Sequence, residues 1–359
     1  MSAHDLPTSG SAWIGGLTQI DRPTIDWVAS TRSAAILAIP VLAAVATGFA
    51  QTGVFVALGC FNVLLLQFVG TANDRLVRSL WGVGLNAGAI GLGTLVGTLG
   101  WVEFPLIAIG LVVASLVDRI PRPGSLLLTV SALFVMGVGF PGASVAEAAG
   151  RVEFVLVGGA LALAGFAIHM AVLRRIGPSP AAPLSAATSV TPRPAPRSHR
   201  GWAHAVAVGV VAATGFALAL GLGLARDYWV MLTVVVVLRA HFGQTFTAGA
   251  ARMTGTVVGA TLAVVLTWGV SEPPLQGLLM VGSVFVTLLM VSANYTLYSV
   301  ALTVFVILLI NLAYPGGLVL AETRVLDTVL GGALAMLAGA ILWSIQSYRP
   351  RADRPRAAV

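Results

Sequence analysis

Apolar residues come in long runs along the chain, and short segments rich in Arg, Pro or Gly separate these runs. An α-helix crosses the hydrocarbon core of a bilayer in about 20 residues, so each run predicts a membrane-spanning helix. Two of the runs are short enough to be re-entrant or tilted segments instead, namely 104–117 and 125–140. The runs number twelve: 33–50, 53–70, 79–99, 104–117, 125–140 and 152–173, then 204–224, 228–242, 252–270, 275–292, 296–313 and 325–345.

The runs fall into two groups of six, and residues 177–200 lie between the groups. This stretch is rich in Pro, Ala and Ser, a composition that cannot bury enough apolar surface to fold. We therefore expect a linker at 177–200 between two membrane units, 33–176 and 201–346. Two tails, 1–32 and 347–359, flank these units.

The two units are related in sequence. Residues 151–162 match residues 324–335 at seven of twelve positions with a shift of 173, and a shift of 174 brings Arg78 onto Arg252. Because each unit has an even number of helices, both units start on the same side of the membrane. The prediction is an all-α polytopic membrane protein with two parallel six-helix repeats that form a pseudo-dimer, and the interface of such repeats is the expected substrate site.

The composition supports the membrane class. Of the 359 residues, 57% are apolar and 9% are charged, whereas an ordinary soluble domain carries about 25% charged residues. A water-soluble globule of this size is therefore excluded. The positive charges all come from Arg, since the chain has no Lys, and this excludes P-loop, Schiff-base and pyridoxal chemistry.

The distribution of Arg predicts the orientation of the chain. With both termini in the cytoplasm, 17 of the 20 basic residues fall on the cytoplasmic side, as the positive-inside rule requires. The other three are Arg151, Arg226 and Arg324. This rule explains the net charge of +7, and a basic stripe typical of nucleic-acid binding is absent. We expect a multi-pass protein of the plasma (inner) membrane, with the linker and both tails in the cytoplasm and no nucleic-acid partner.

Arg78 and Arg252 are the leading candidates for binding an anionic substrate. Each is expected to begin the third helix of its unit, where the helix dipole and the free N–H groups favour anions. A guanidinium group at that place would make a bidentate anion site. The alternative is that each is a cytoplasmic anchor, and Asp74, four residues before Arg78, favours this alternative for Arg78.

Small residues follow these arginines at a spacing that predicts close helix packing. Glycines four residues apart lie on one face of a helix and let two backbones approach each other. We assign them to packing rather than to substrate contact. The pairs are Gly84 with Gly88, Gly93 with Gly97, and Gly255 with Gly259.

Asp327 and Glu153 are the candidates for proton coupling, because both lie near the start of the last helix of a unit. A carboxyl group at membrane depth can bind and release a proton. The alternative for Asp327 is a local ion pair with Arg324 at the i,i+3 spacing. The two carboxyl groups are one position out of register between the units, so a symmetric pair is not expected.

Patterns of catalytic or metal-binding residues are missing from the sequence. His169, His204 and His241 occur singly, and the single cysteine, Cys60, lies inside an apolar run. Neither an HExxH motif nor a GxSxG motif is present. We expect no enzymatic activity, no catalytic residues, no metal and no cofactor.

Two stretches of the second unit resemble the fusaric acid resistance family, whose members are also described as aromatic acid exporters. The segment with Asn294 and Tyr295, and the segment with Arg324 and Asp327, resemble later parts of this family. The resemblance covers about residues 204–345, because the first unit has Val54-Phe55 in place of Tyr-Trp. The two stretches read Tyr228-Trp229-Val230-Met231-Leu232-Thr233 and Arg252-Met253-Thr254-Gly255-Thr256-Val257-Val258-Gly259-Ala260.

This resemblance implies efflux of small aromatic or other organic acids, or of related toxic anions, driven by the proton gradient. Arg252 would bind the substrate carboxylate with Arg78 as its weaker partner, as arginines line the anion pathway in the similar plant malate channels. Trp229, Thr233 and Tyr295 would contribute to the same site. Larger members carry a soluble domain, so this chain resembles a short form.

The partners expected on this interpretation are a small organic anion and the lipid bilayer, and the architecture is compatible with a homo-oligomer. Two alternatives stay open from the sequence. One is a passive organic-anion channel, and the other is a non-transporting membrane scaffold for envelope assembly.

Overall fold

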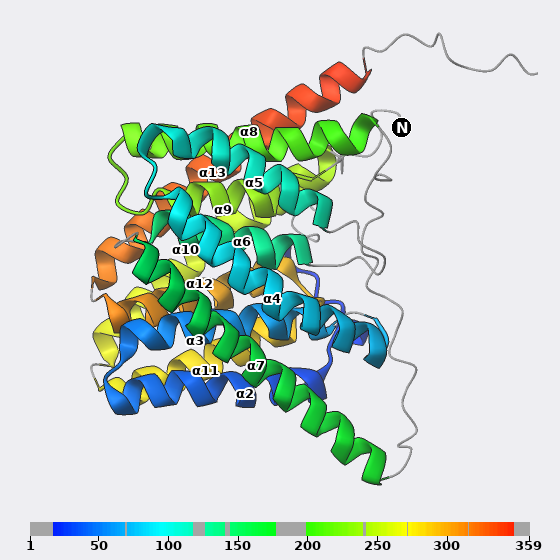
Figure 1. The fold of residues 1–359 in the computed structure, drawn as a ribbon, viewed down its shortest axis with the longest axis vertical. Coiled ribbons are helices and arrows are strands. Elements are labelled where there is room, and N and C mark those ends of the chain that lie inside the picture. Colours follow the sequence, from blue (N-terminus) through cyan, green and yellow to red (C-terminus); the bar gives the residue numbers. More distant parts are fainter. Residues whose placement is uncertain are drawn as a thin grey trace, which may run out of the picture.

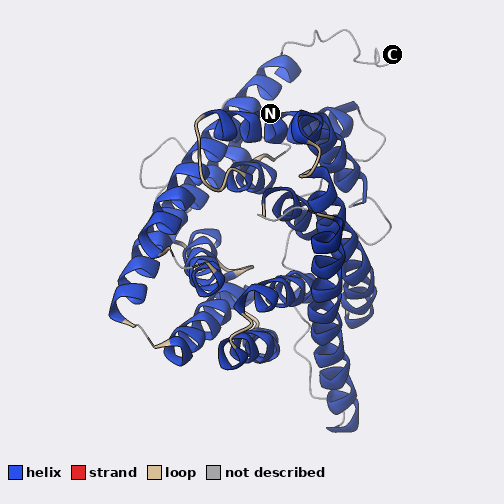
Figure 2. Ribbon diagram, turned by 60° about the vertical axis from the view of Figure 1, so that its left-hand side comes forward, coloured by secondary structure: helices blue, strands red, loops and turns tan. Residues whose placement is uncertain are grey.

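The computed structural model describes residues 17–68, 70–117, 126–140, 144–176, 199–239, 242–270, 272–314 and 316–347. Within these ranges the regular elements are all helices (Figure 2). Most of the predicted linker, together with the outer parts of both predicted tails, lies outside the described residues.

The described residues form twelve α-helices, joined in places by short 3-10 turns at Arg22–Thr24, Leu66–Phe68 and Gly100–Val102. Six helices come from the first predicted unit and six from the second (Figure 1). The first six are α2 (Trp27–Thr47), α3 (Ala50–Leu65), α4 (Ala72–Val96), α5 (Glu103–Val117), α6 (Leu126–Gly139) and α7 (Val145–Ile176). The second six are α8 (His199–Gly221), α9 (Tyr228–Val237), α10 (Phe242–Gly269), α11 (Pro273–Met290), α12 (Tyr295–Ala313) and α13 (Gly317–Ser347).

Nine helices in the described part of the chain are long and apolar enough to cross a membrane. The three shorter apolar helices are α5, α6 and α9, and two of these were the short runs of the sequence. The chain is therefore a multi-pass membrane protein.

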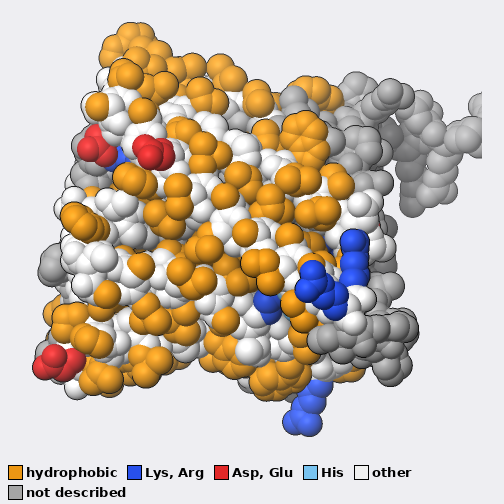
Figure 3. All heavy atoms as spheres, turned by 60° about the horizontal axis from the view of Figure 1, so that its bottom comes forward, with side chains coloured by type: hydrophobic (Ala, Val, Ile, Leu, Met, Phe, Trp, Pro, Cys, Tyr) orange, Lys and Arg blue, Asp and Glu red, His pale blue; other side chains and the backbone are white. Residues whose placement is uncertain are grey.

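The two ends of the bundle differ in charge. Helix α7 ends and α8 begins at one end, on the right in Figure 1, which we call the linker end. On the face shown in Figure 3, Arg side chains gather at the linker end and Asp and Glu side chains at the opposite end. Large apolar side chains cover much of the surface between the two ends, among them Ile39, Leu92 and Val113. Apolar side chains of this kind suit contact with lipid.

Four helices begin earlier than predicted, and each error has the same cause. In the sequence an arginine marks the predicted start of each helix, but these arginines lie one to three turns inside the helix. Their side chains are only 2–3% exposed, so they belong to the interior of the bundle. The expected position of Arg78 and Arg252 at a helix N-terminus is therefore wrong. The helices are α4, α7, α10 and α13, and the arginines are Arg78, Arg151, Arg252 and Arg324.

The same pairs of helices pack together in both halves. Helix α3 packs on α7 as α9 packs on α13, and α4 lies against α6 and α7 as α10 lies against α12 and α13. Between the halves, α2 packs on α11 and α5 on α8, while α6 meets α9 and α3 meets α12. The two halves therefore share one core, in which the rings of Phe61 and Phe305 are 5.5 Å apart.

The glycine spacing predicts packing correctly for Gly255 with Gly259 and for Gly93 with Gly97, and wrongly for Gly84 with Gly88. A Cβ built on Gly255 or Gly259 would lie 2.5 Å from Ser299 Cβ or from the Val300 carbonyl oxygen, respectively, so α10 and α12 touch there. Gly84 and Gly88 have no neighbouring helix within 4 Å. They lie on the exposed face of α4, and Gly93 and Gly97 on another face of this helix meet α6 instead.

The chain before α2 crosses to the second half, where it lies against the turn between α11 and α12. We call residues 17–25 the N-terminal strap. Asn294 Nδ2 donates hydrogen bonds to the carbonyl oxygens of Leu17 and Gln19 at 3.1 and 2.8 Å, and the amide of Asp21 donates to the backbone of the turn at 3.0 Å. Asn294 Oδ1 accepts from the first turn of α12, so one side chain caps a helix and holds the strap.

We expect Gly259→Ala to destabilise the protein and Gly88→Ala to be tolerated. The added methyl group at residue 259 meets a backbone carbonyl that cannot move away, which costs about 1–3 kcal/mol. At residue 88 the methyl group meets open space and alanine favours the helix. Thermal unfolding in detergent measures the two effects, and equal melting temperatures for the two variants would contradict the packing described.

We expect Asn294→Asp to release the N-terminal strap without losing the cap of α12. The carboxylate still accepts from the helix, but its oxygen faces the two carbonyl oxygens that Nδ2 now holds. Asn294→Ala loses both functions, and the lost cap alone costs about 1 kcal/mol. Limited proteolysis ahead of α2 measures strap release, and cleavage at the wild-type rate in Asn294→Asp contradicts the role of this amide.

Candidate anion-binding site in the second half

A buried guanidinium group stacked on an indole ring is the centre of the candidate site. Arg324 lies in α13, about two turns from its start, and its guanidinium carbon is 3.4 Å from the centroid of the Trp229 ring in α9. The Arg324 side chain is 2% exposed, and its Nε and Nη1 atoms have no hydrogen-bond partner among the described residues. The ring stabilises the positive charge, while the N–H groups stay available to an anion.

A close contact between two helices holds this pair in place. A Cβ built on Gly331 would lie 2.7 Å from the Val230 carbonyl oxygen and 2.8 Å from Thr233 Cβ, so α13 approaches α9 to backbone contact. Thr233, a predicted substrate residue, donates its hydroxyl to the Trp229 carbonyl oxygen at 2.8 Å. Thr233 therefore lies beside the site, and its hydroxyl proton is used within α9.

Arg252 brings a second positive charge to the same region. It lies in α10, is 2% exposed, and its Nε has no hydrogen-bond partner among the described residues. Electrostatic interactions connect Arg252 to Arg324 and to Tyr298. The ring of Tyr295 stacks at 5.8 Å on that of Tyr298, and the buried Tyr295 hydroxyl also lacks a partner there. The predicted residues Arg252, Trp229 and Tyr295 are thus grouped around Arg324.

Asp327 is completely buried, and its two carboxyl oxygens accept no hydrogen bond from a described residue. The alternative of a local pair with Arg324 is wrong, since the two side chains form no ion pair within the described structure and Arg324 turns to Trp229. Electrostatic interactions still connect Asp327 to Arg324 and to Asp227. A buried carboxyl group therefore lies near the buried guanidinium group of Arg324.

Two predicted residues lie elsewhere. Arg78 is in the first half, where its Nε donates to the Asp74 carbonyl oxygen at 3.2 Å, and no contact joins it to Arg252 in the part of the chain that the structure describes. The expected partnership of the two arginines is therefore wrong, because their helices pack within different halves. Glu153 is exposed on the outer face of α7, so the expectation of a carboxyl group inside the bundle holds for Asp327 but not for Glu153.

Aromatic rings extend the site towards the end of the bundle opposite the linker end. The rings of Trp229 and Tyr228 stack at 4.9 Å, and Phe140 from the first half lies 5.6 Å from Tyr228. Arg226 donates to the Tyr228 hydroxyl at 3.4 Å and lies 5.8 Å from the ring of Tyr314. Arginines and aromatic rings thus alternate from the partly exposed Arg226 to the buried Arg324.

The first half has a similar arginine with different surroundings. Arg151 corresponds to Arg324 in the sequence repeat, and its guanidinium carbon lies 5.2 Å from the Phe55 ring, as Arg324 lies over Trp229. However, Arg151 Nη1 donates to Thr94 Oγ1 at 3.1 Å, and Arg151 Nε lies 3.8 Å from Glu147 Oε2. The first-half arginine is therefore held by protein groups.

Three residues of this region were not predicted as binding candidates from the sequence: Arg324, Tyr228 and Asp227. Arg324 was considered only as a partner for Asp327. The repeat itself contained the missing signal, because Arg151 and Arg324 are identical residues in its best-matched segment. In the described ranges, no three His, Cys, Asp or Glu side chains come together as a metal site requires.

Asp227 lies between α8 and α9, outside the membrane-spanning helices. Burial raises the pKa of Asp227 to about 6, against the opposing effect of a hydrogen bond from the Tyr228 backbone. Between its ordinary pKa and pH 6 the folded chain holds this proton while the unfolded chain has lost it. Stability therefore falls as the pH rises through this window and stays at the lower value above it.

We expect Asp227→Asn to raise the melting temperature at pH 8 and to leave it unchanged near pH 4, because the variant removes a buried negative charge present only at the higher pH. Melting temperatures in detergent between pH 4 and pH 8 measure this effect. Glu272→Gln, at an exposed position, is the control for loss of one carboxyl group. A pH-independent effect of Asp227→Asn would contradict this assignment.

Comparison with known proteins gives a match over the second half. The family model described as fusaric acid resistance protein-like matches residues 211–338, which confirms the resemblance seen in the sequence. The matched range contains Trp229, Arg252, Arg324 and Asp327, so the candidate site lies entirely within it.

One relative is inner membrane protein YccS of Escherichia coli (strain K12), which is 30% identical over 148 residues. These residues are 41% of this chain, and the chain spans only about a fifth of the relative's length, at 20%. No solved structure matches the chain.

Proposed function

We propose that this protein, whose residues 211–338 match the fusaric acid resistance protein-like family, transports small organic anions across the inner membrane. Efflux of aromatic acids is the activity that the site supports best. The observation that carries the proposal is the pair of Arg324 and Trp229, in which the guanidinium carbon lies 3.4 Å from the ring centroid.

The chemistry of this pair suits an aromatic carboxylate. A guanidinium group with free N–H groups binds a carboxylate through two parallel hydrogen bonds. The rings of Trp229 and Tyr228 give the surroundings of Arg324 an aromatic character that suits an aromatic substrate. Arg252 supplies a second charge towards the linker end, and the Tyr295 hydroxyl supplies a further hydrogen-bond donor. A substrate anion would in addition balance the excess of two guanidinium groups over the one carboxyl group of Asp327.

Proton coupling is assigned to Asp327. Its carboxyl group is completely buried beside Arg324, so the charge of one group affects the other. An anion bound at Arg324 and a proton bound at Asp327 would therefore influence each other's affinity. Asp227, which acts on Asp327 and has a pKa of about 6, extends this connection to the end opposite the linker end.

The proposed architecture is twelve spans in two parallel repeats that form a pseudo-dimer, with both termini in the cytoplasm. It is supported by the shift of 173–174 in the sequence and by the same helix pairs packing in both halves. A repeated glycine contact adds to this, because Gly158 meets the Val56 carbonyl oxygen as Gly331 meets that of Val230. The site lies in the second repeat, near the ring of Phe140 from the first.

We expect Arg324→Gln and Arg252→Ala each to lower the uptake of labelled benzoate into proteoliposomes by about 10–100-fold, since each removes a charged hydrogen-bond donor worth about 1.5–3 kcal/mol. Arg324→Lys should recover little, because an ammonium group lacks the planar fork. Trp229→Leu should lower the preference for benzoate over acetate about fivefold, which corresponds to one aromatic contact of about 1 kcal/mol.

Arg175→Gln is the control, because it removes the same single positive charge at an exposed position, at the end of α7. Transport at the wild-type level in Arg324→Gln with correct membrane insertion would disprove the site. Asp327→Asn tests coupling: it should keep downhill flux and lose accumulation driven by a pH gradient. Wild-type flux that ignores the gradient would instead identify a passive channel.

A further inference from the structure

Three arginines of the first half form a second cationic cluster, which the transport proposal does not use. Arg32 lies in α2, and Arg75 and Arg78 lie in the first two turns of α4. The side chains of Arg75 and Arg78 are only 8% and 3% exposed. Electrostatic interactions connect Arg32 with Arg75 and Arg75 with Arg78. Three guanidinium groups thus lie close together at the linker end.

Each of the three guanidinium groups donates a hydrogen bond from one nitrogen. The acceptors lie close together, in the segment that joins α3 to α4 and in the first turn of α4. Arg32 Nη2 donates to Gln67 Oε1 at 3.3 Å, Arg75 Nε donates to the Gly70 carbonyl oxygen at 3.0 Å, and Arg78 Nε donates to a carbonyl oxygen in the first turn of α4 at 3.2 Å. The side chain of Gln67 is itself fixed, because its Nε2 donates to a carbonyl oxygen of α7 at 3.2 Å. The guanidinium groups are therefore pre-oriented.

Gly70 provides room for this arrangement. It has a φ of +87°, and a Cβ built on it would lie 2.6 Å from Arg78 Nη2. Only a glycine lets the Arg78 side chain pass so close to the corner. The remaining nitrogen, Arg78 Nη1, is buried without a hydrogen-bond partner in the described structure, as is Arg32 Nε.

The two carboxylates near the cluster interact with its arginines, Asp26 with Arg32 and Arg75 and Asp74 with Arg78, and both also serve as helix caps. Asp26 accepts a hydrogen bond from the Ala29 amide at the start of α2. Asp74 accepts from the amide and the hydroxyl of Thr71 in the capping box of α4. Three positive charges are thus set against two carboxylates that serve as helix caps, so the cluster keeps positive charge and donors for an external anion.

The sequence repeat shows that the cluster is not part of the shared transport architecture. At a shift of 174, Gly249 stands in the position of Arg75, Ala248 in that of Asp74 and Val206 in that of Arg32. Only Arg78 has an arginine counterpart. Such a feature, present in one half alone, needs an explanation beyond the fold common to both halves.

We infer that Arg32, Arg75 and Arg78 bind a phosphate group, with an anionic phospholipid headgroup as its source. Guanidinium groups match phosphate oxygens in geometry and charge. Arg75 and Arg78 lie three and six residues after the start of α4, about 5–9 Å along the helix, a depth that suits a headgroup phosphate. On the outer face of the same helix, Leu80 and Trp81 are each 53% exposed, and they offer apolar surface to acyl chains.

The experiment uses the full chain in phosphatidylcholine nanodiscs, with and without phosphatidylglycerol, and with inorganic phosphate as a separate addition. Specific binding to the folded state raises the melting temperature by roughly 2–4 °C. A rise with phosphatidylglycerol alone identifies the lipid headgroup. An equal rise with inorganic phosphate shows that a free phosphate occupies the site. No rise with either ligand overturns the inference.

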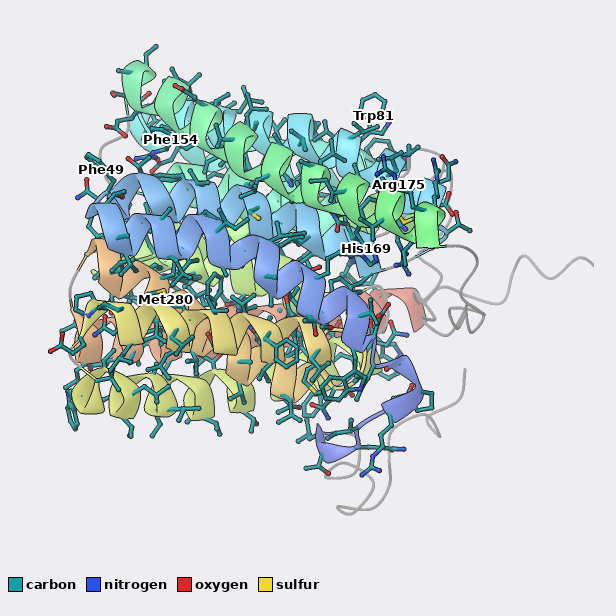
Figure 4. All side chains as sticks on the ribbon, turned by 90° about the horizontal axis from the view of Figure 1, so that it is seen from below. Phe49, Trp81, Phe154, His169, Arg175 and Met280 are labelled. Carbon is teal, nitrogen blue, oxygen red and sulfur yellow. The ribbon has the colours of Figure 1, made fainter. Side chains whose placement is uncertain are left out.

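The double variant Arg75→Gln with Arg78→Gln should abolish the rise in melting temperature. If this double variant folds poorly, Arg32→Gln, at a partly exposed position, tests the same cluster and should halve the rise. The control is Arg174→Gln with Arg175→Gln, two exposed arginines at the linker end, where Figure 4 places Arg175 and Trp81. This control should keep the full rise, and an equal loss in both double variants would show non-specific charge attraction. Benzoate transport is measured in phosphatidylcholine alone, so failure of this inference leaves the transport proposal unaffected.

Discussion

A guanidinium group inside a helix bundle needs compensation for its charge, because water is excluded and the surrounding side chains are apolar. Among the buried arginines of the described residues, four stand at positions that correspond between the two halves in the sequence: Arg78 with Arg252, and Arg151 with Arg324. The rest of the architecture accommodates them. Glycines bring the neighbouring helices to backbone contact, and aromatic rings lie over the guanidinium groups of Arg151 and Arg324.

The buried arginines Arg151 and Arg324 have different surroundings in the two halves. Arg151 is compensated by a hydroxyl group, a backbone carbonyl and Glu147. Arg324 lies over the face of Trp229, and two of its nitrogens have no acceptor among the residues that the structure describes. The first arrangement is complete without a ligand. The second leaves donors in a low-dielectric environment, which is where an anion gains most from binding.

Much of the fold follows from the sequence, because the length of apolar runs fixes the number and order of the helices. The starts of α4, α7, α10 and α13 do not, since a charged residue looks like a helix boundary whenever its burial is unknown. Periodicity alone also cannot tell which face of a helix meets a neighbour. Gly84 and Gly88 have the same spacing as Gly255 and Gly259, yet only the latter pair touches another helix.

Only some residues of the candidate site could be predicted from the sequence, for a related reason. Motif resemblance identifies Trp229 and Arg252, but the central contact joins Arg324 to Trp229 across 95 residues of sequence and depends on the approach of two helices at Gly331. Arg78 illustrates the opposite failure. Its alignment with Arg252 suggests a shared role, whereas Asp74, Arg75 and Gly70 give it surroundings that its counterpart lacks.

The N-terminal strap has a consequence for the biogenesis of the protein. Leu17 and Gln19 are synthesised long before their hydrogen-bond donor, Asn294, which is 277 and 275 residues further along the chain. These contacts can form only after α11 has been synthesised and its turn has reached the surface. The N-terminal strap can therefore dock only late in synthesis, when insertion of the bundle is nearly complete.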